Sequence, residues 1–188
     1  MDAFSYLSVL NSIVLGLGVA SLLAGFASMV RARSRLVMYW PLPAQMLLVF
    51  LLHVQIWWAL FSLRGRVLWD FPGFLVVLMQ PVLAYLAAAF LVPDIKEGER
   101  IDLRQAYFRE ARWFFGALIL LVADSLVKSL LLYGALPNAK DLAGHCAFIF
   151  LSLVGMISRR DTVHKIIVPI SLMVLAAYIM TLFVTLPK

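Results

Sequence analysis

Hydrophobic residues run along this chain in six long stretches, separated by short segments that carry most of the charged residues. A helix of about 20 apolar residues is long enough to cross the hydrocarbon core of a bilayer. The pattern therefore predicts six membrane-spanning helices, at about residues 4–30, 39–63, 71–92, 113–133, 139–157 and 163–186. We expect an all-α polytopic membrane protein, a six-transmembrane-helix bundle in which residues 1–188 form a single transmembrane domain.

The composition agrees with this fold class and excludes two others. Of the 188 residues, 64% are hydrophobic and 14% are charged, whereas soluble domains average about 45–50% apolar and about 25% charged residues. A disordered chain would be poor in aromatic residues, but 13% of these residues are aromatic. The single cysteine, Cys146, cannot form an internal disulfide, and no Cys/His array predicts a metal site.

Lysine and arginine are distributed unevenly between the connections, and this bias predicts the orientation in the membrane. The first, third and fifth connections, together with Lys165, hold eleven of these residues, and the opposite side holds four. We therefore expect the three basic connections in the cytoplasm and both termini on the external or periplasmic side. Basic residues near a membrane attract anionic lipid headgroups by about 1 kcal/mol each, which makes the bilayer an expected partner. No nucleic-acid partner is expected, because the chain has no basic domain with stacking aromatic residues.

The longest connection, residues 94–112, alternates apolar and basic residues at roughly helical spacing. This pattern predicts an amphipathic cytoplasmic helix that lies among the headgroups and leads into the fourth span. Docking of a soluble partner is the alternative interpretation. His164 belongs to the next basic connection, and we expect it to be solvated.

Polar residues inside the spans are the strongest functional signal, because polar groups in hydrocarbon are expensive and are commonly functional. The depth of each polar residue can be counted inward from the external end of its span, at about 1.5 Å per residue. By this count the polar residues and Tyr178 lie at similar depths, in the outer half of the bundle. They predict an outward-facing polar cavity, closed below by apolar residues, that handles a small ion or solute. The candidate binding residues are Asn11, His53, Gln55, Gln80, Asp124, Lys128 and His145.

Asp124 and Lys128 stand at positions i and i+4 of the fourth span, with the acid first, which is the favourable order for an ion pair. Such a pair either orients the helices or titrates when a proton or ligand arrives. His53 is either a proton carrier or a neutral histidine bonded to a neighbouring helix. In the first span, small residues four apart, beginning at Gly16, predict a close approach of another helix.

A channel or transporter is the favoured function, and the histidines and the predicted ion pair suit proton-linked movement. No inverted repeat is found, so six helices per chain suggest a minimal carrier or a homo-oligomer. One alternative is a sensor or assembly factor that signals to a cytoplasmic partner. A less favoured alternative is a redox protein in which His53 and His145 hold haem. An enzyme is not favoured and no catalytic residue is assigned, because motifs such as GxSxG and HExxH are absent.

Three segments carry a resemblance to known proteins: NSIVLGLGVASLLAG, HVQIWWALFSLR and AYFREARWFFG. They resemble a family of small, uncharacterised prokaryotic multi-pass membrane proteins. The resemblance implies a location in the inner (cytoplasmic) membrane. It implies no activity, ligand or site residue.

Overall fold

The computed structural model of the protein describes residues 3–66, 68–95 and 100–182. Each of its six α-helices is long and apolar enough to cross a membrane, and this confirms the predicted all-α six-helix fold class. The helices are α1 (Ala3–Arg31), α2 (Pro41–Leu60), α3 (Phe71–Leu91), α4 (Leu103–Tyr133), α5 (Ala139–Ile157) and α6 (Asp161–Leu182). Two short 3₁₀ turns and two short strands, β1 (Leu36–Val37) and β2 (Ile101–Asp102), lie in the described connections.

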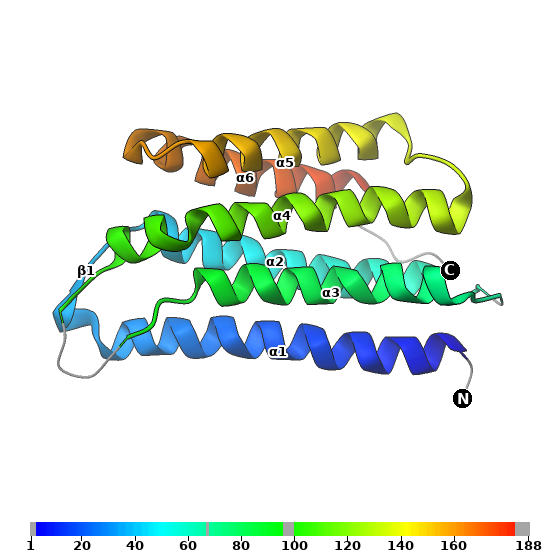
Figure 1. The fold of residues 1–188 in the computed structure, drawn as a ribbon, viewed down its shortest axis with the longest axis horizontal. Helices are drawn as coiled ribbons and strands as arrows, with labels where there is room; N and C mark the ends of the chain where they lie inside the picture. Colours follow the sequence, from blue (N-terminus) through cyan, green and yellow to red (C-terminus); the bar gives the residue numbers. More distant parts are fainter. Residues whose placement is uncertain (1–2, 67, 96–99, 183–188) are drawn as a thin grey trace.

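The helices lie along one long axis, and each runs opposite to the next in the chain (Figure 1). α3 packs against α1 and α4, α4 also packs against α5, and α2 contacts α1, α3 and α6. One end of the bundle, here called the terminal end, holds the start of α1, the end of α6 and the α2–α3 and α4–α5 connections. The opposite end, here called the basic end, holds the other three connections.

Polar side chains set the helix boundaries at the connections. Asp70 precedes α3 and accepts a hydrogen bond from the backbone N–H of Gly73 at 3.0 Å, and Asp102 caps α4 in the same way. α4 stops at Gly134, whose φ of 69° is a left-handed conformation that favours glycine. Asn138 then caps the start of α5. The α4–α5 connection is therefore a tight turn that brings these two helices side by side.

The predicted helix that leads into the fourth span is present, but its described part is shorter than segment 94–112. α4 begins at Leu103 and continues unbroken into the fourth span. Just before it, β2 pairs in parallel with β1, with Leu36 opposite Ile101. Backbone pairing with the α1–α2 connection therefore replaces helix formation in this part of the connection. Residues 96–99 lie outside the described residues.

The small-residue stripe that begins at Gly16 does not meet a neighbouring helix. A Cβ carbon at Gly16 would have no heavy atom within 4 Å. Gly18 and Gly25 instead face the bundle, where a Cβ at position 25 would stand 2.7 Å from Cγ1 of Val92 and one at position 18 would clash with the ring of His53. The close approach therefore occurs on the face of α1 that carries Gly18 and Gly25, and not at Gly16 as the spacing predicts.

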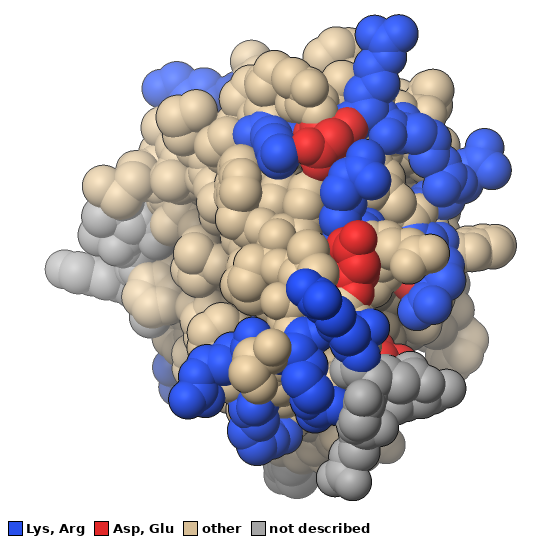
Figure 2. Space-filling view, turned by 90° about the vertical axis from the view of Figure 1, so that its left-hand side faces the viewer, with Lys and Arg blue, Asp and Glu red and all other residues tan. Residues whose placement is uncertain are grey.

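Basic side chains gather at the basic end of the bundle, where acidic ones are fewer (Figure 2). They come from the end of α1, from the connections, from the first three turns of α4 and from the start of α6. The described members are Arg31, Arg33, Arg35, Arg100, Arg104, Arg109, Arg112, Arg159, Arg160 and Lys165.

Candidate functional site

Side chains of α2 to α6 surround a cavity of about 250 Å³, here called the polar cavity. It reaches from the terminal end, where Leu63, Tyr133 and Pro137 line it, toward the middle of the bundle. Its deeper walls are apolar and include Leu52, Leu118, Leu121, Val122, Phe148 and Leu175. Its polar lining includes Gln55, Gln80, Ser125, Lys128, Asp141, His145 and Tyr178.

Asp141, His145 and Ser125 form a continuous chain of hydrogen bonds on the wall of the polar cavity. Nδ1 of His145 lies 3.0 Å from Oδ1 of Asp141 and 2.8 Å from the Asp141 carbonyl oxygen. Nε2 of His145 lies 3.0 Å from Oγ of Ser125. Asp141 and His145 are four residues apart on α5 and therefore share a face. Ser125 approaches them from α4.

The partners of His145 determine where the proton of its neutral ring lies. Both oxygens near Nδ1 are acceptors, so Nδ1 must carry the N–H and donate it. Nε2 then has a free lone pair and accepts the hydroxyl proton of Ser125. The His145 ring is buried, whereas Ser125 is half-buried on the cavity wall.

Two further contacts hold Asp141 in place. The Tyr178 hydroxyl donates to Oδ1 of Asp141 at 2.6 Å. This approach depends on Gly144, because the ring of Tyr178 packs directly over its Cα. Asn138 accepts the backbone N–H of Asp141 at 3.0 Å and so fixes the first turn of α5. The carboxylate is therefore oriented from both α5 and α6.

Lys128 is bonded across the cavity to a residue other than the one predicted. Its Nζ donates to Oε1 of Gln80 on α3 at 2.6 Å. The predicted Asp124–Lys128 ion pair is absent from the described residues, where Oδ2 of Asp124 is buried without a hydrogen-bond partner. The long, flexible side chain of Lys128 reaches α3, so it bonds to Gln80 rather than to Asp124 on its own helix.

Asn11 and His53 lie away from the polar cavity, although they were predicted to belong to it. Both are buried. Nδ2 of Asn11 donates to the carbonyl oxygen of Leu7 at 2.9 Å, and Nδ1 of His53 lies 2.7 Å from the carbonyl oxygen of Val49. Each side chain thus bonds to the preceding turn of its own helix, which indicates a packing role. Asp124 is likewise not among the residues that line the cavity, whereas Gln55, Gln80, Lys128 and His145 are.

The histidine geometry does not suit the predicted haem alternative. Nε2 of His53 is buried against Gly18, and a single added methyl group there would already clash with it. Both ring nitrogens of His145 have protein partners, Asp141 and Ser125. Haem ligation by this pair would require the His53 ring to leave its position and His145 to give up its contact with Ser125.

Sequence reasoning did not include Asp141 or Ser125 among the candidate binding residues. The signal for Asp141 was present, because it stands four residues before His145 with the acid first. It lies only two residues inside the predicted fifth span, nearer the external end than the polar residues that were counted as one layer. The signal for Ser125 was its one-turn proximity to Lys128, but the sequence does not show which side chain faces α5.

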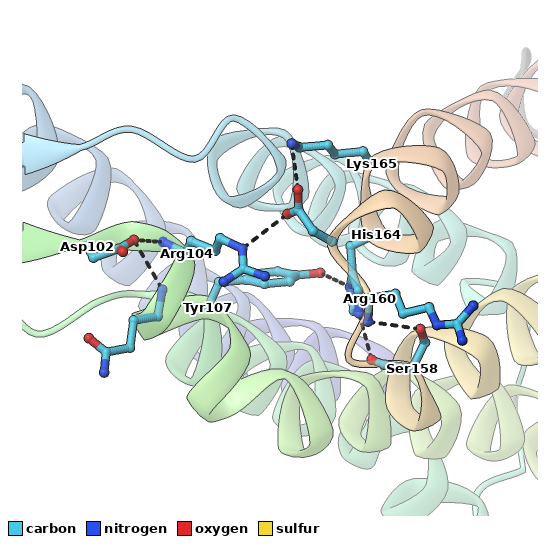
Figure 3. Close-up of polar contacts among 9 residues, drawn as sticks. Asp102, Arg104, Tyr107, Ser158, Arg160, His164 and Lys165 are labelled. Carbon is cyan, nitrogen blue, oxygen red and sulfur yellow. Dashed lines mark hydrogen bonds and ion pairs between the residues drawn. The ribbon is translucent and has the colours of Figure 1, made fainter.

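A second polar region lies at the basic end, where α4 meets α6 (Figure 3). His164 is completely buried, contrary to the expectation that it is solvated. Its Nδ1 lies 2.9 Å from the Tyr107 hydroxyl, and its Nε2 lies 2.9 Å from the Ser158 carbonyl oxygen. The carbonyl oxygen can only accept, so Nε2 carries the proton of the neutral ring and Tyr107 donates to Nδ1. This histidine ties the two helices together at their first turns.

An open groove of about 670 Å³ lies beside this contact at the basic end. Asp161 forms ion pairs nearby with Lys165, at 2.6 Å, and with Arg104, at 3.4 Å (Figure 3). The groove surface is polar and exposed, which suits contact with water or headgroups rather than enclosure of a small molecule. Its charged lining residues are Asp94, Arg100, Asp102, Arg104, Arg109 and Arg159.

Comparison of the chain with protein-family models, with curated proteins and with solved structures found no match.

Proposed function

We propose that the protein is a membrane carrier that binds a small solute in the polar cavity and moves it together with a proton. One observation carries this proposal: a lysine ammonium and a carboxylate–imidazole pair line the same cavity, between helices that are apolar enough to cross a membrane. Ionisable groups within membrane spans commonly mark substrate or proton pathways. Pockets with apolar walls and a few polar groups are also the usual form of small-molecule sites.

The lining of the cavity favours an anionic head on a short apolar body. Lys128 has three N–H donors, and Gln80 accepts one of them. The remaining donors can bind a carboxylate or sulfonate without breaking the bond to Gln80. The deeper leucine, valine and phenylalanine residues match a hydrocarbon tail. The solute class that fits is therefore a small amphipathic anion.

His145 is the group best placed to exchange the proton. In its neutral form its Nε2 accepts from Ser125 at the cavity wall, and Asp141 stabilises the imidazolium that forms when Nε2 is protonated. The other titratable groups that line the cavity are Lys128, Tyr133 and Tyr178. Lys128 opposes protonation of His145 and Asp141 favours it, so binding of an anion at Lys128 would ease proton uptake.

Uptake into proteoliposomes tests this function. The probe is radiolabelled butanesulfonate, an anion with a short apolar tail that stays charged, with pyranine inside the vesicles to report pH. We expect saturable entry of the probe with acidification of the interior. Lys128→Met should abolish both signals, whereas Lys140→Met, which removes an exposed lysine, should change neither. Entry no faster than in protein-free vesicles would overturn the carrier function.

We further infer that the basic end faces the cytoplasm in the cytoplasmic membrane, with anionic headgroups around it. Positive charge on cytoplasmic connections supports this orientation, and the open arginine-lined groove offers donors to phosphate groups. Cysteine labelling tests the orientation after Cys146 is replaced by serine. A membrane-impermeant maleimide applied to intact cells should label Leu136→Cys at the terminal end, but not Ser34→Cys at the basic end. The reverse pattern would contradict the inference.

A further inference from the structure

The contacts of Ser125 on the wall of the polar cavity are those of an activated hydroxyl. A serine hydroxyl becomes a nucleophile when a base accepts its proton and a third group orients that base. Here Oγ of Ser125 lies 3.0 Å from Nε2 of His145, and Nδ1 of the same ring lies 3.0 Å from a carboxylate oxygen of Asp141. Both distances fall within the range expected of a nucleophile, base and orienting carboxylate.

We propose that Ser125, His145 and Asp141 form an acyl-transfer site that hydrolyses a small ester inside the polar cavity. Such a site is recognised by geometry and roles rather than by position in the sequence. The acid and the histidine come from one turn of α5, and the serine comes from α4. The chain therefore needs no GxSxG motif to bring these groups together.

The reaction balances with water as the co-reactant. Oγ of Ser125 attacks the ester carbonyl carbon while its proton moves to Nε2 of His145. The bond to the alcohol oxygen breaks, and the alcohol leaves with the proton from Nε2. Water then attacks the acyl-serine, gives one proton to Nε2 and releases the carboxylic acid. The proton on Nε2 returns to Oγ of Ser125.

The surroundings select the class of ester. The apolar wall suits a short acyl chain, and the opening toward the terminal end provides a route for water. Lys128 lies three residues after Ser125, on a neighbouring position of the same helix face. Its ammonium lines the same cavity and can bind the carboxylate product. The product has the chemistry of the anion that we propose as the transported solute, although the hydrolytic step does not depend on transport.

Two other features support a reactive rather than a packing role for this serine. The Asp141 carboxylate is held by Tyr178 and by the cap at Asn138, so the base is oriented before any ligand binds. Ser129, one turn further along α4, provides the contrast. Its hydroxyl donates to the carbonyl oxygen of Ala135 at 2.8 Å, whereas the hydroxyl of Ser125 is bonded to the histidine.

Labelling by a fluorophosphonate tests the nucleophile in the full-length protein in detergent. In this reaction the serine oxygen bonds to phosphorus and fluoride leaves. Peptide mass mapping should find one adduct, on Ser125. Ser125→Ala should remove it, His145→Gln should slow its formation by about 10²-fold or more, and Ser129→Ala should leave it unchanged.

Hydrolysis of p-nitrophenyl butyrate separates the positioning role of Asp141 from the role of the nucleophile Ser125. Asp141 is a positioning residue, so we expect Asp141→Asn to lower kcat by about 10²-fold or more with little change in KM. Folded wild-type protein without an adduct, an adduct on another residue, or labelling at the same rate in His145→Gln would each overturn the proposal. The wild-type result is the deciding one, so a variant that fails to fold leaves the test intact. A negative result in the labelling and hydrolysis assays would not change the outcome of the butanesulfonate uptake assay. A negative uptake result would likewise leave the labelling and hydrolysis assays valid.

Discussion

The ring of Tyr178 packs so closely over Gly144 that a Cβ carbon at position 144 would stand 2.6 Å from Cδ2 of the ring. This contact lets α6 approach α5, and it brings the Tyr178 hydroxyl to Asp141. The orientation of the carboxylate thus depends on the absence of a side chain one turn away.

Gly144→Ala should therefore displace Tyr178 and weaken its bond to Asp141. Overpacking of this kind costs about 1–3 kcal/mol, and we expect a loss of this size in unfolding experiments in mixed detergent. Gly116→Ala is the matched control, because a Cβ at position 116 meets no heavy atom within 4 Å. Alanine is favoured over glycine inside a helix by roughly 0.5–1 kcal/mol, so the control should be neutral or more stable. Equal stability of the two variants would contradict the close contact.

The partner of Lys128 can be measured with two double-mutant cycles. Lys128→Met combined with Gln80→Leu should give a coupling energy of about 1 kcal/mol or more, because the two residues share a hydrogen bond. Lys128→Met combined with Asp124→Asn should give a smaller value, because no ion pair joins these two residues. A larger coupling with Asp124 would restore the ion pair that the sequence predicts.

Gly18 and Gly16 provide a test of which face of α1 is packed. Gly18→Ala should destabilise the protein by about 1–3 kcal/mol, because the added methyl group meets the His53 ring. Gly16→Ala should not destabilise it, since its Cβ has open space. In a His53→Ala background the ring is gone, so the cost of Gly18→Ala should largely disappear. Persistence of the full cost there would show that another residue is responsible.

Tyr107→Phe isolates the hydrogen bond to His164 at the basic end. The variant keeps the ring packing but removes the donor to Nδ1, and we expect a loss of about 1 kcal/mol in unfolding free energy. Tyr133→Phe is the control, because that side chain is 62% exposed. If Tyr107→Phe were as stable as the control, the buried contact would contribute nothing to holding α4 against α6.

The number and approximate positions of the helices could be predicted because a bilayer demands long apolar segments, and the sequence shows these directly. Depth along each helix could also be counted, and Gln55, Gln80, Lys128 and His145 do line one cavity. Whether any of them binds a solute stays a prediction.

Rotation of each helix about its own axis could not be predicted, because lipid-facing and buried positions in a membrane are similarly apolar. His53 and Asn11 are buried but do not line the polar cavity. The same uncertainty hid the contact between Ser125 and His145, which depends on how α4 and α5 face each other. Lys128 shows a second reason why the contacts of the site could not be predicted. Its long side chain reaches a neighbouring helix, which spacing rules within one helix do not consider.

The members of the hydrogen-bonded chain on the wall of the polar cavity all come from α4, α5 and α6. Chains are synthesised from the N-terminus, and early parts organise before later ones exist. The helices α1, α2 and α3 are therefore made before the opposite wall of the cavity exists. The hydrogen-bonded chain is complete only once α6 brings Tyr178 against Asp141, so assembly of the cavity wall depends on α6.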